Sequence, residues 1–140
     1  METLLLALTL LLPTEASRPA ALQWGWGSSP TQVENQVQQQ GWEPLKPLHK
    51  SEQAGHLSQM SFRLPQPLRG SESIRTYVFR NNMLVRVYLL TRGTGAKKVV
   101  FLFNTSYRQL TPTVWVDPTS GTRVDQAWLE DSQVFTVSPG

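Results

Sequence analysis

The chain has 140 residues, which is enough for one domain and short for two. Charged residues make up 16% and hydrophobic residues 39%, and the low charge with ten prolines and nine glycines disfavours a helical bundle. The chain has no cysteine, so cysteine catalysis, thiolate metal sites and redox switching are excluded. Any domain must therefore be stabilised by packing alone or by docking on a larger partner.

The first 16 residues have the pattern of a secretory signal peptide. An apolar run interrupted only by Thr9 covers residues 4–12, and Thr14 and Ala16 supply small residues before a cleavage site after residue 16. Nine residues are too few for a membrane-spanning helix, which needs about 20. No Lys or Arg precedes the run, so a buried helix opening a cytosolic domain is the alternative. We expect a signal peptide over 1–16, a secreted or luminal protein, and no transmembrane segment.

Residues 17–60 are poor in aliphatic side chains and rich in Gln, Pro, Ser and Gly. Such a composition buries little apolar surface and predicts a flexible, low-complexity arm. A short helix can form over residues 31–40, with Thr31 and Glu34 as a capping box. Its apolar side chains, Val33 and Val37, would share one face.

Two tryptophans, Trp24 and Trp26, lie in this arm on either side of a glycine. Exposed tryptophans of this kind can anchor in a pocket of a partner, so both are partner-anchor candidates. The alternative is that the arm folds back and covers an apolar face of a sheet.

Residues 61–140 form the predicted β-rich domain. Runs over 74–80 and 83–91 are rich in β-branched and aromatic residues, and only Asn81 and Asn82 separate them. This pattern predicts a hairpin with a type I′ turn. With a regular register, one apolar face would carry Ile74, Thr76, Val78, Val85, Val87 and Leu89, and a mixed face would carry Arg75, Tyr77, Phe79, Leu84, Arg86 and Tyr88.

Further strands are predicted over 97–104, 113–116, 122–128 and 133–137, the first of them central and covered on both faces. Short strands near ten residues apart predict a mainly β fold, as an antiparallel sandwich or a partial barrel. Trp115 and Trp128 are expected in its core. No internal repeat is visible in the sequence.

Positive charge is concentrated between residues 60 and 108, where nine Lys and Arg face one acidic residue, for a net charge of +8. Arginines beside aromatic rings can bind sulfated glycans or acidic protein surfaces. The alternatives are that these arginines solubilise exposed strands, or that the acidic C-terminal segment neutralises them. Nucleic acid is not expected, since the spacing fits no known module. The anion-binding candidates are Arg75, Arg86, Arg92, Lys97 and Lys98.

Asn104 begins an N-x-S/T sequon at the end of a predicted strand, so we expect it to be glycosylated, although such a sequon can arise by chance. Catalytic patterns are almost absent. The only histidines, His49 and His56, have no third ligand near them, so neither a metal nor another cofactor is predicted.

These patterns predict a secreted or luminal glycoprotein that acts as a non-catalytic interaction module, binding an anionic partner through an arginine-rich, aromatic face. The alternative is a fragment, isoform or accessory β domain of a larger extracellular enzyme or receptor. The identity of the partner and the oligomeric state are left open by the sequence.

Overall fold

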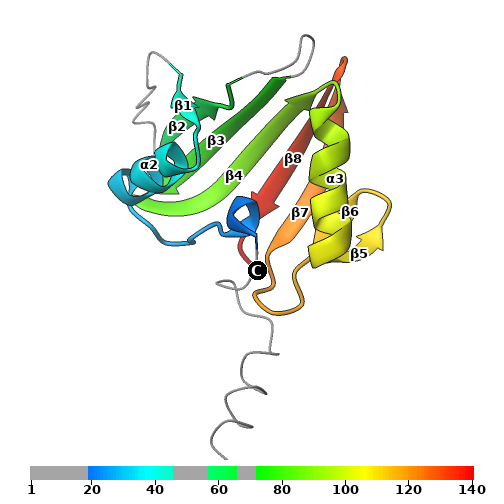
Figure 1. The fold of residues 1–140 in the computed structure, drawn as a ribbon. Coiled ribbons are helices and arrows are strands. Elements are labelled where there is room, and N and C mark those ends of the chain that lie inside the picture. The colour runs from blue at the N-terminus through cyan, green and yellow to red at the C-terminus, as the bar shows by residue number, and fades with distance from the viewer. Residues whose placement is uncertain (1–18, 46–56, 66–71) are drawn as a thin grey trace, which may run out of the picture.

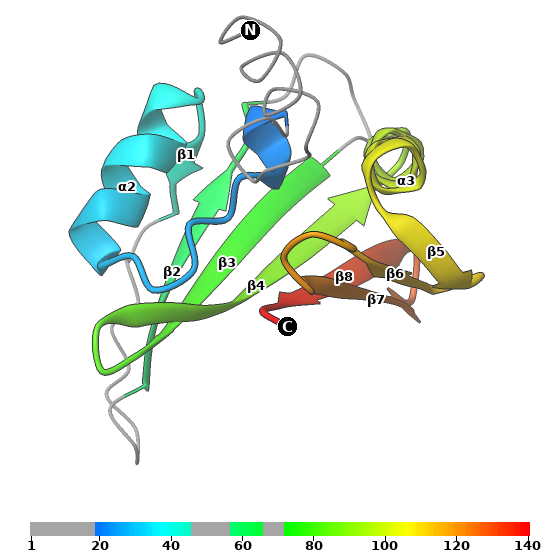
Figure 2. The same cartoon turned by 90° about the horizontal axis from the view of Figure 1, so that it is seen from below.

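The computed structural model describes residues 19–45, 57–65 and 72–140. The expected signal peptide and both histidines lie outside these residues. Within these residues, eight strands form one antiparallel sheet, and two helices lie apart from each other on the same face of it (Figures 1 and 2). The mainly β class is confirmed. The strands belong to one sheet that is not closed into a barrel, and helices form the second layer.

The sheet has the order β1-β2-β3-β4-β8-β7-β6-β5. From each edge to the centre, four strands therefore follow one another in chain order. Each half of the chain contributes a helix and then four strands, and β4 meets β8 in the middle (Figure 1). The fold therefore contains a topological repeat that the sequence does not reveal. The elements are η2 (Ala20–Leu22), α2 (Pro30–Gln39), β1 (Glu43–Pro44), β2 (Leu57–Arg63), β3 (Glu72–Arg80), β4 (Met83–Arg92), α3 (Gly95–Ser106), β5 (Arg108–Thr111), β6 (Val114–Val116), β7 (Arg123–Leu129) and β8 (Ser132–Ser138).

The predicted hairpin between β3 and β4 is confirmed. Asn81 and Asn82 have φ of 51° and 60°, as a type I′ turn requires. The predicted register is correct only beside the turn, because a β-bulge shifts the pairing by one residue after Phe79. The predicted faces were therefore wrong for the part of β4 beyond the bulge. The buried face carries Arg75, Tyr77, Phe79, Leu84, Val87 and Leu89.

The short helix α2 forms close to the predicted place but begins one residue earlier. Its N-cap is Ser29, whose side chain accepts a hydrogen bond from the Gln32 amide while the Gln32 side-chain oxygen accepts one from the Ser29 amide. The predicted capping box at Thr31 and Glu34 was wrong, because Pro30 already occupies the first helical position.

Residues 19–45 pack against the sheet, although their composition predicts a flexible arm. The buried side chains Leu22, Trp24, Val33 and Val37 from this segment belong to the hydrophobic core. Two backbone hydrogen bonds, from Gly27 to the Leu84 carbonyl and from the Leu84 amide to Ser28, tie the segment to β4. A few large apolar side chains therefore order a segment that is polar on average.

The strand predicted over residues 97–104 is wrong, because these residues lie in helix α3. In a strand, alternate apolar side chains would point away from the core. In the helix, Ala96 and Phe103 lie two turns apart on the same face, and both are buried in the core. Tertiary burial here overrides the β propensity of the Val-Val-Phe run.

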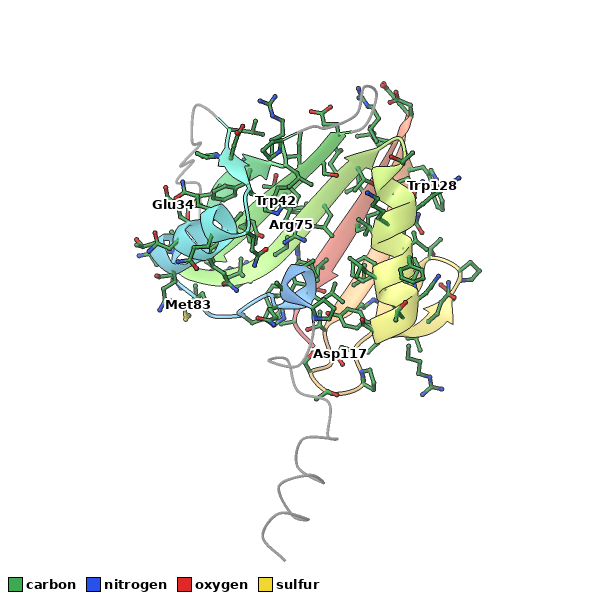
Figure 3. All side chains as sticks on the ribbon, viewed as in Figure 1. Glu34, Trp42, Arg75, Met83, Asp117 and Trp128 are labelled. Atoms are coloured by element: carbon green, nitrogen blue, oxygen red, sulfur yellow. The ribbon has the colours of Figure 1, made fainter. Side chains whose placement is uncertain are left out.

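The core lies between the helices and the sheet. Trp115 is fully buried there, as expected, and its ring packs near Phe103 and Phe135. The expectation for Trp128 was wrong. This side chain is 61% exposed, because it lies near the end of β7 and α3 does not cover it (Figure 3).

Candidate functional site

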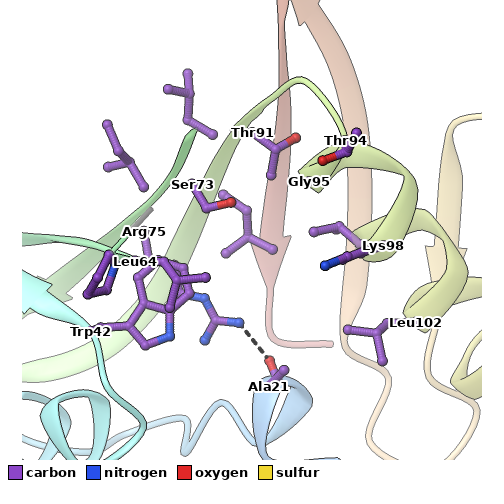
Figure 4. Close-up of a pocket in the computed structure, with 15 residues that line it drawn as sticks. Ala21, Trp42, Leu64, Ser73, Arg75, Thr91, Thr94, Gly95, Lys98 and Leu102 are labelled. Atoms are coloured by element: carbon purple, nitrogen blue, oxygen red, sulfur yellow. Dashed lines mark hydrogen bonds between the residues drawn. The ribbon is translucent and has the colours of Figure 1, made fainter. Parts of the chain in front are cut away.

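A cavity of about 220 Å³ lies between α3, the helix-covered face of β3 and β4, and the N-terminal segment. Its walls are mainly apolar and include Leu89, Val99 and Leu102. Trp42 closes one side, and the backbone around Ala21 lies at one end (Figure 4). We call this space the α3 cavity. Figure 4 shows polar side chains reaching into it from both the sheet and the helix.

Arg75 is the buried charge of the α3 cavity and is only 8% exposed. Its Nη2 donates to the Ala21 carbonyl at 3.1 Å, and Nη1 donates to the Tyr77 hydroxyl at 3.3 Å. The guanidinium lies 4.7 Å from the Trp42 ring centroid and 5.5 Å from that of Trp24, within cation–π range.

These contacts are with neutral groups. Within the described residues, no carboxylate forms an ion pair with Arg75, whereas Arg92 and Arg123 both have acidic partners. A buried cation without a counter-ion costs free energy that cation–π and neutral hydrogen-bond contacts offset only in part. The α3 cavity therefore has an unbalanced positive charge at one end.

Arg75 faces inward because it alternates with the buried Tyr77 and Phe79 along β3, and the bulge in β4 brings Leu89 to the same face. Leu89, which lies opposite Arg75, is buried on the same face. Without the bulge, Leu89 would lie opposite Ile74. The side chains of Tyr77 and Arg75 are two residues apart, so they share this face and can hydrogen-bond to each other.

Lys98 brings a second positive charge to the α3 cavity. It lies in the first turns of α3 and is exposed, and its side chain lines the cavity from the helix side (Figure 4). Among the described residues that line the cavity, none is acidic. Two cations and apolar walls without a carboxylate form an environment suited to an anion with an apolar body.

The five anion-binding candidates are divided among three places. Arg75 and Lys98 meet at the α3 cavity. Arg86 and Arg92 lie on the other face of β4, since their neighbours Val87 and Thr91 are buried beneath the helices.

The charges outside the cavity are partly neutralised or separated from it. Arg92 lies 3.6 Å from an Asp131 oxygen and 4.0 Å from a Glu72 oxygen. The fifth candidate, Lys97, lines a separate groove between α3 and β7 that also contains Trp128. The hydrogen bond to Asp125 raises the pKa of Arg123 on the exposed surface. The five candidates therefore do not lie on one face.

The two partner-anchor candidates are held within the fold. The Trp24 indole nitrogen donates to the Tyr107 hydroxyl at 2.9 Å, and Trp26 donates to Thr122 Oγ1 at 3.0 Å. Their rings stack with centroids 6.3 Å apart. Trp24 is buried and Trp26 is partly buried against the core, which is the arrangement of the alternative in which the arm covers an apolar sheet face.

Asn104 lies on α3 instead of at a strand end, and its side chain is exposed. Its Oδ1 accepts a hydrogen bond from Trp115 Nε1 at 2.8 Å. An N-linked sugar attaches to the side-chain nitrogen, which this hydrogen bond does not use. Glycosylation of Asn104 stays a prediction.

Among the cavity residues that sequence reasoning missed are Thr91, Trp42 and Leu102. Thr91 is 2% exposed and was included in a predicted strand, but a regular register would put Thr91 and Arg75 on opposite faces of the hairpin. No signal in the sequence connects Trp42 with Arg75, because their contact joins the N-terminal segment to β3. Leu102 was assigned to a strand and not to a helix.

In the described ranges, no three His, Cys, Asp or Glu side chains cluster as metal ligands would. Within the same ranges, every helix is too short or too polar to cross a bilayer. The chain matches no model of a known protein family, and no curated protein or solved structure is significantly similar to it.

Proposed function

We propose that this protein is a non-catalytic binding module of the secretory pathway, and that it binds an organic anion with an apolar body in the α3 cavity. The observation that carries the proposal is the buried Arg75 guanidinium, which faces an apolar space and has no carboxylate partner among the described residues. An anion entering the cavity would supply the missing counter-charge.

The apolar walls support a ligand that is more than a small inorganic ion. Leu89, Val99 and Leu102 would cover a hydrocarbon or aromatic body, and burial of that body supplies affinity in proportion to its area. Lys98, at the helix side, would interact with the same ligand and increase its association rate.

A small ligand accounts for the distribution of charge better than a sulfated glycan or an acidic protein surface. Those larger partners need several cations on one exposed face, and the five candidates are divided among three places. The alternative of an accessory domain in a larger extracellular protein is compatible with the same cavity, and it assigns the binding to that larger assembly.

Charge reversal of Lys98 tests the site. We expect Lys98→Glu to weaken binding of the anionic dye anilinonaphthalene sulfonate about tenfold, because a carboxylate would then face the bound anion. Binding of the neutral dye N-phenylnaphthylamine should change little. Fluorescence titration of both dyes against the full chain measures the two affinities.

Lys97→Glu is the matched control, because it makes the same charge change one residue away, outside the cavity. A further variant, Leu102→Trp, should fill the cavity and remove binding of both dyes. Equal effects of the two lysine variants on the anionic dye would refute binding in the α3 cavity.

Secretion and glycosylation form a separate prediction. Expressed in a secreting eukaryotic cell, the protein should reach the medium with Ser17 as its first residue and carry a glycan on Asn104. Ser106→Ala should remove the glycan without disturbing the Asn104 to Trp115 hydrogen bond, and Ser106→Thr should retain it.

N-terminal sequencing and the mobility shift on glycosidase treatment measure both features. An intracellular product that begins at Met1 and has no shift would contradict the secretory assignment. It would leave the dye-binding test unaffected, because that test does not depend on the compartment.

A further inference from the structure

The end of the α3 cavity away from Arg75 is polar. Ser73 and Thr91 are directly opposed on β3 and β4, and Thr94 immediately precedes α3. We call these three residues the hydroxyl pole. Gly95 approaches it so closely that a Cβ there would lie 3.1 Å from the Ser73 hydroxyl oxygen. Figure 4 shows the hydroxyl pole and Arg75 at different ends of the cavity.

Thr91 is the unexplained member of the hydroxyl pole. Its Oγ1 is buried and has no hydrogen-bond partner within the described residues. An unpaired buried hydroxyl is costly, and native structures retain few of them. In Figure 4 the hydroxyl points towards the start of α3, so a ligand atom that reaches this end of the cavity would receive its hydrogen bond.

The start of α3 adds a second group of donors to the same place. The helix has 12 residues, its N-cap Thr94 forms no side-chain cap, and its first turn contains no acidic residue. The first backbone amides of a helix have no partner within it, and together they carry a partial positive charge. The hydroxyl pole and the start of α3 therefore supply donors at the same end of the cavity.

We propose that the ligand of the α3 cavity carries an acidic group at each end of an apolar chain, as an α,ω-dicarboxylate does. This inference rests on the proposed function and specifies its ligand class. One carboxylate pairs with Arg75, and the other accepts hydrogen bonds from Thr91 and from the start of α3. The apolar middle contacts Leu89 and Leu102.

The spacing of the two ends requires a chain of several carbons. Arg75 lies opposite Leu89, and Thr91 is two residues further along β4. Two residues of a strand span roughly 7 Å. The Arg75 side chain also extends towards Ala21, away from the hydroxyl pole, which increases the separation (Figure 4).

Calorimetric titration of the full chain with octanoate and octanedioate tests the second acidic group. We expect octanedioate to bind about tenfold more tightly than octanoate, as one additional charge-assisted contact would give. Thr91→Val should remove most of that difference and leave octanoate binding unchanged, since it replaces only the hydroxyl. Thr136→Val is the matched control, because it makes the same replacement on the helix-free face of β8.

The outcomes separate the two proposals. If octanoate binds and octanedioate binds no more tightly, the second acidic group is refuted and the proposed function stands. Binding of neither acid to the wild type would overturn both. Unchanged preference for octanedioate in Thr91→Val would overturn the role of the hydroxyl pole, and retained octanoate binding shows that this variant is folded.

Discussion

Trp24→Ala is expected to lower the free energy of unfolding by about 3–5 kcal/mol, the usual range for removing a large buried aromatic side chain. Trp24 is 3% exposed, and its indole nitrogen donates a hydrogen bond to the Tyr107 hydroxyl at 2.9 Å. Its ring also lies 5.5 Å from the Arg75 guanidinium. The substitution leaves a cavity, deprives Tyr107 of this donor and weakens the support of Arg75.

Urea denaturation followed by circular dichroism measures the loss. Trp128→Ala is the matched control, because the same change at a 61% exposed side chain should alter stability by about 0.5 kcal/mol or less. Similar values for the two variants would show that the segment around Trp24 is not part of the cooperative unit. The large difference is expected because Trp24 joins residues 19–45 to both α3 and the sheet.

Phe103→Ala is expected to cost a similar amount, about 3–5 kcal/mol. The Phe103 ring is fully buried, and its centroid lies 5.6 to 5.7 Å from those of Tyr107, Trp115 and Phe135. This aromatic cluster joins α3 to β6 and β8. Its loss should also loosen the wall of the α3 cavity, so Phe103→Ala should weaken dye binding as well.

The control for Phe103 lies on the same helix. Phe101 is 69% exposed, and Phe101→Ala should change stability by about 0.5 kcal/mol or less. The pair also distinguishes a helix from a strand. Residues two apart share one face of a strand but lie on different faces of a helix, so equal losses would contradict α3.

The sequence by itself determined the features that depend on short-range chemistry. Asn81 and Asn82 tolerate positive φ, so the β3–β4 hairpin and its first residue pairs could be predicted before any contact was known. The spacing of Val33 and Val37 predicted α2 for the same reason, although not its cap. The mainly β class followed from composition and turn spacing.

Only the tertiary structure decided which face of the hairpin is buried. One extra residue in a bulge moves every later side chain of that strand to the opposite face. Strand β4 contains no Gly or Pro that would indicate the bulge. The bulge in β4 put Leu89 and Thr91 on the same face as Arg75. For the candidate site, sequence reasoning therefore found two of its charged residues, Arg75 and Lys98, but neither their common location nor the partners around them.

Long-range burial also decided that α3 is a helix and that residues 19–45 are ordered. The residues of α3 have a local preference for strand, and the N-terminal segment has a composition typical of disorder. Both are ordered because Phe103 and Trp24 bury large rings in one shared core, and contacts between residues 83 positions apart cannot be inferred from local patterns. Local propensity contributes tenths of a kcal/mol per residue, whereas burial of one aromatic ring contributes about 2–3 kcal/mol.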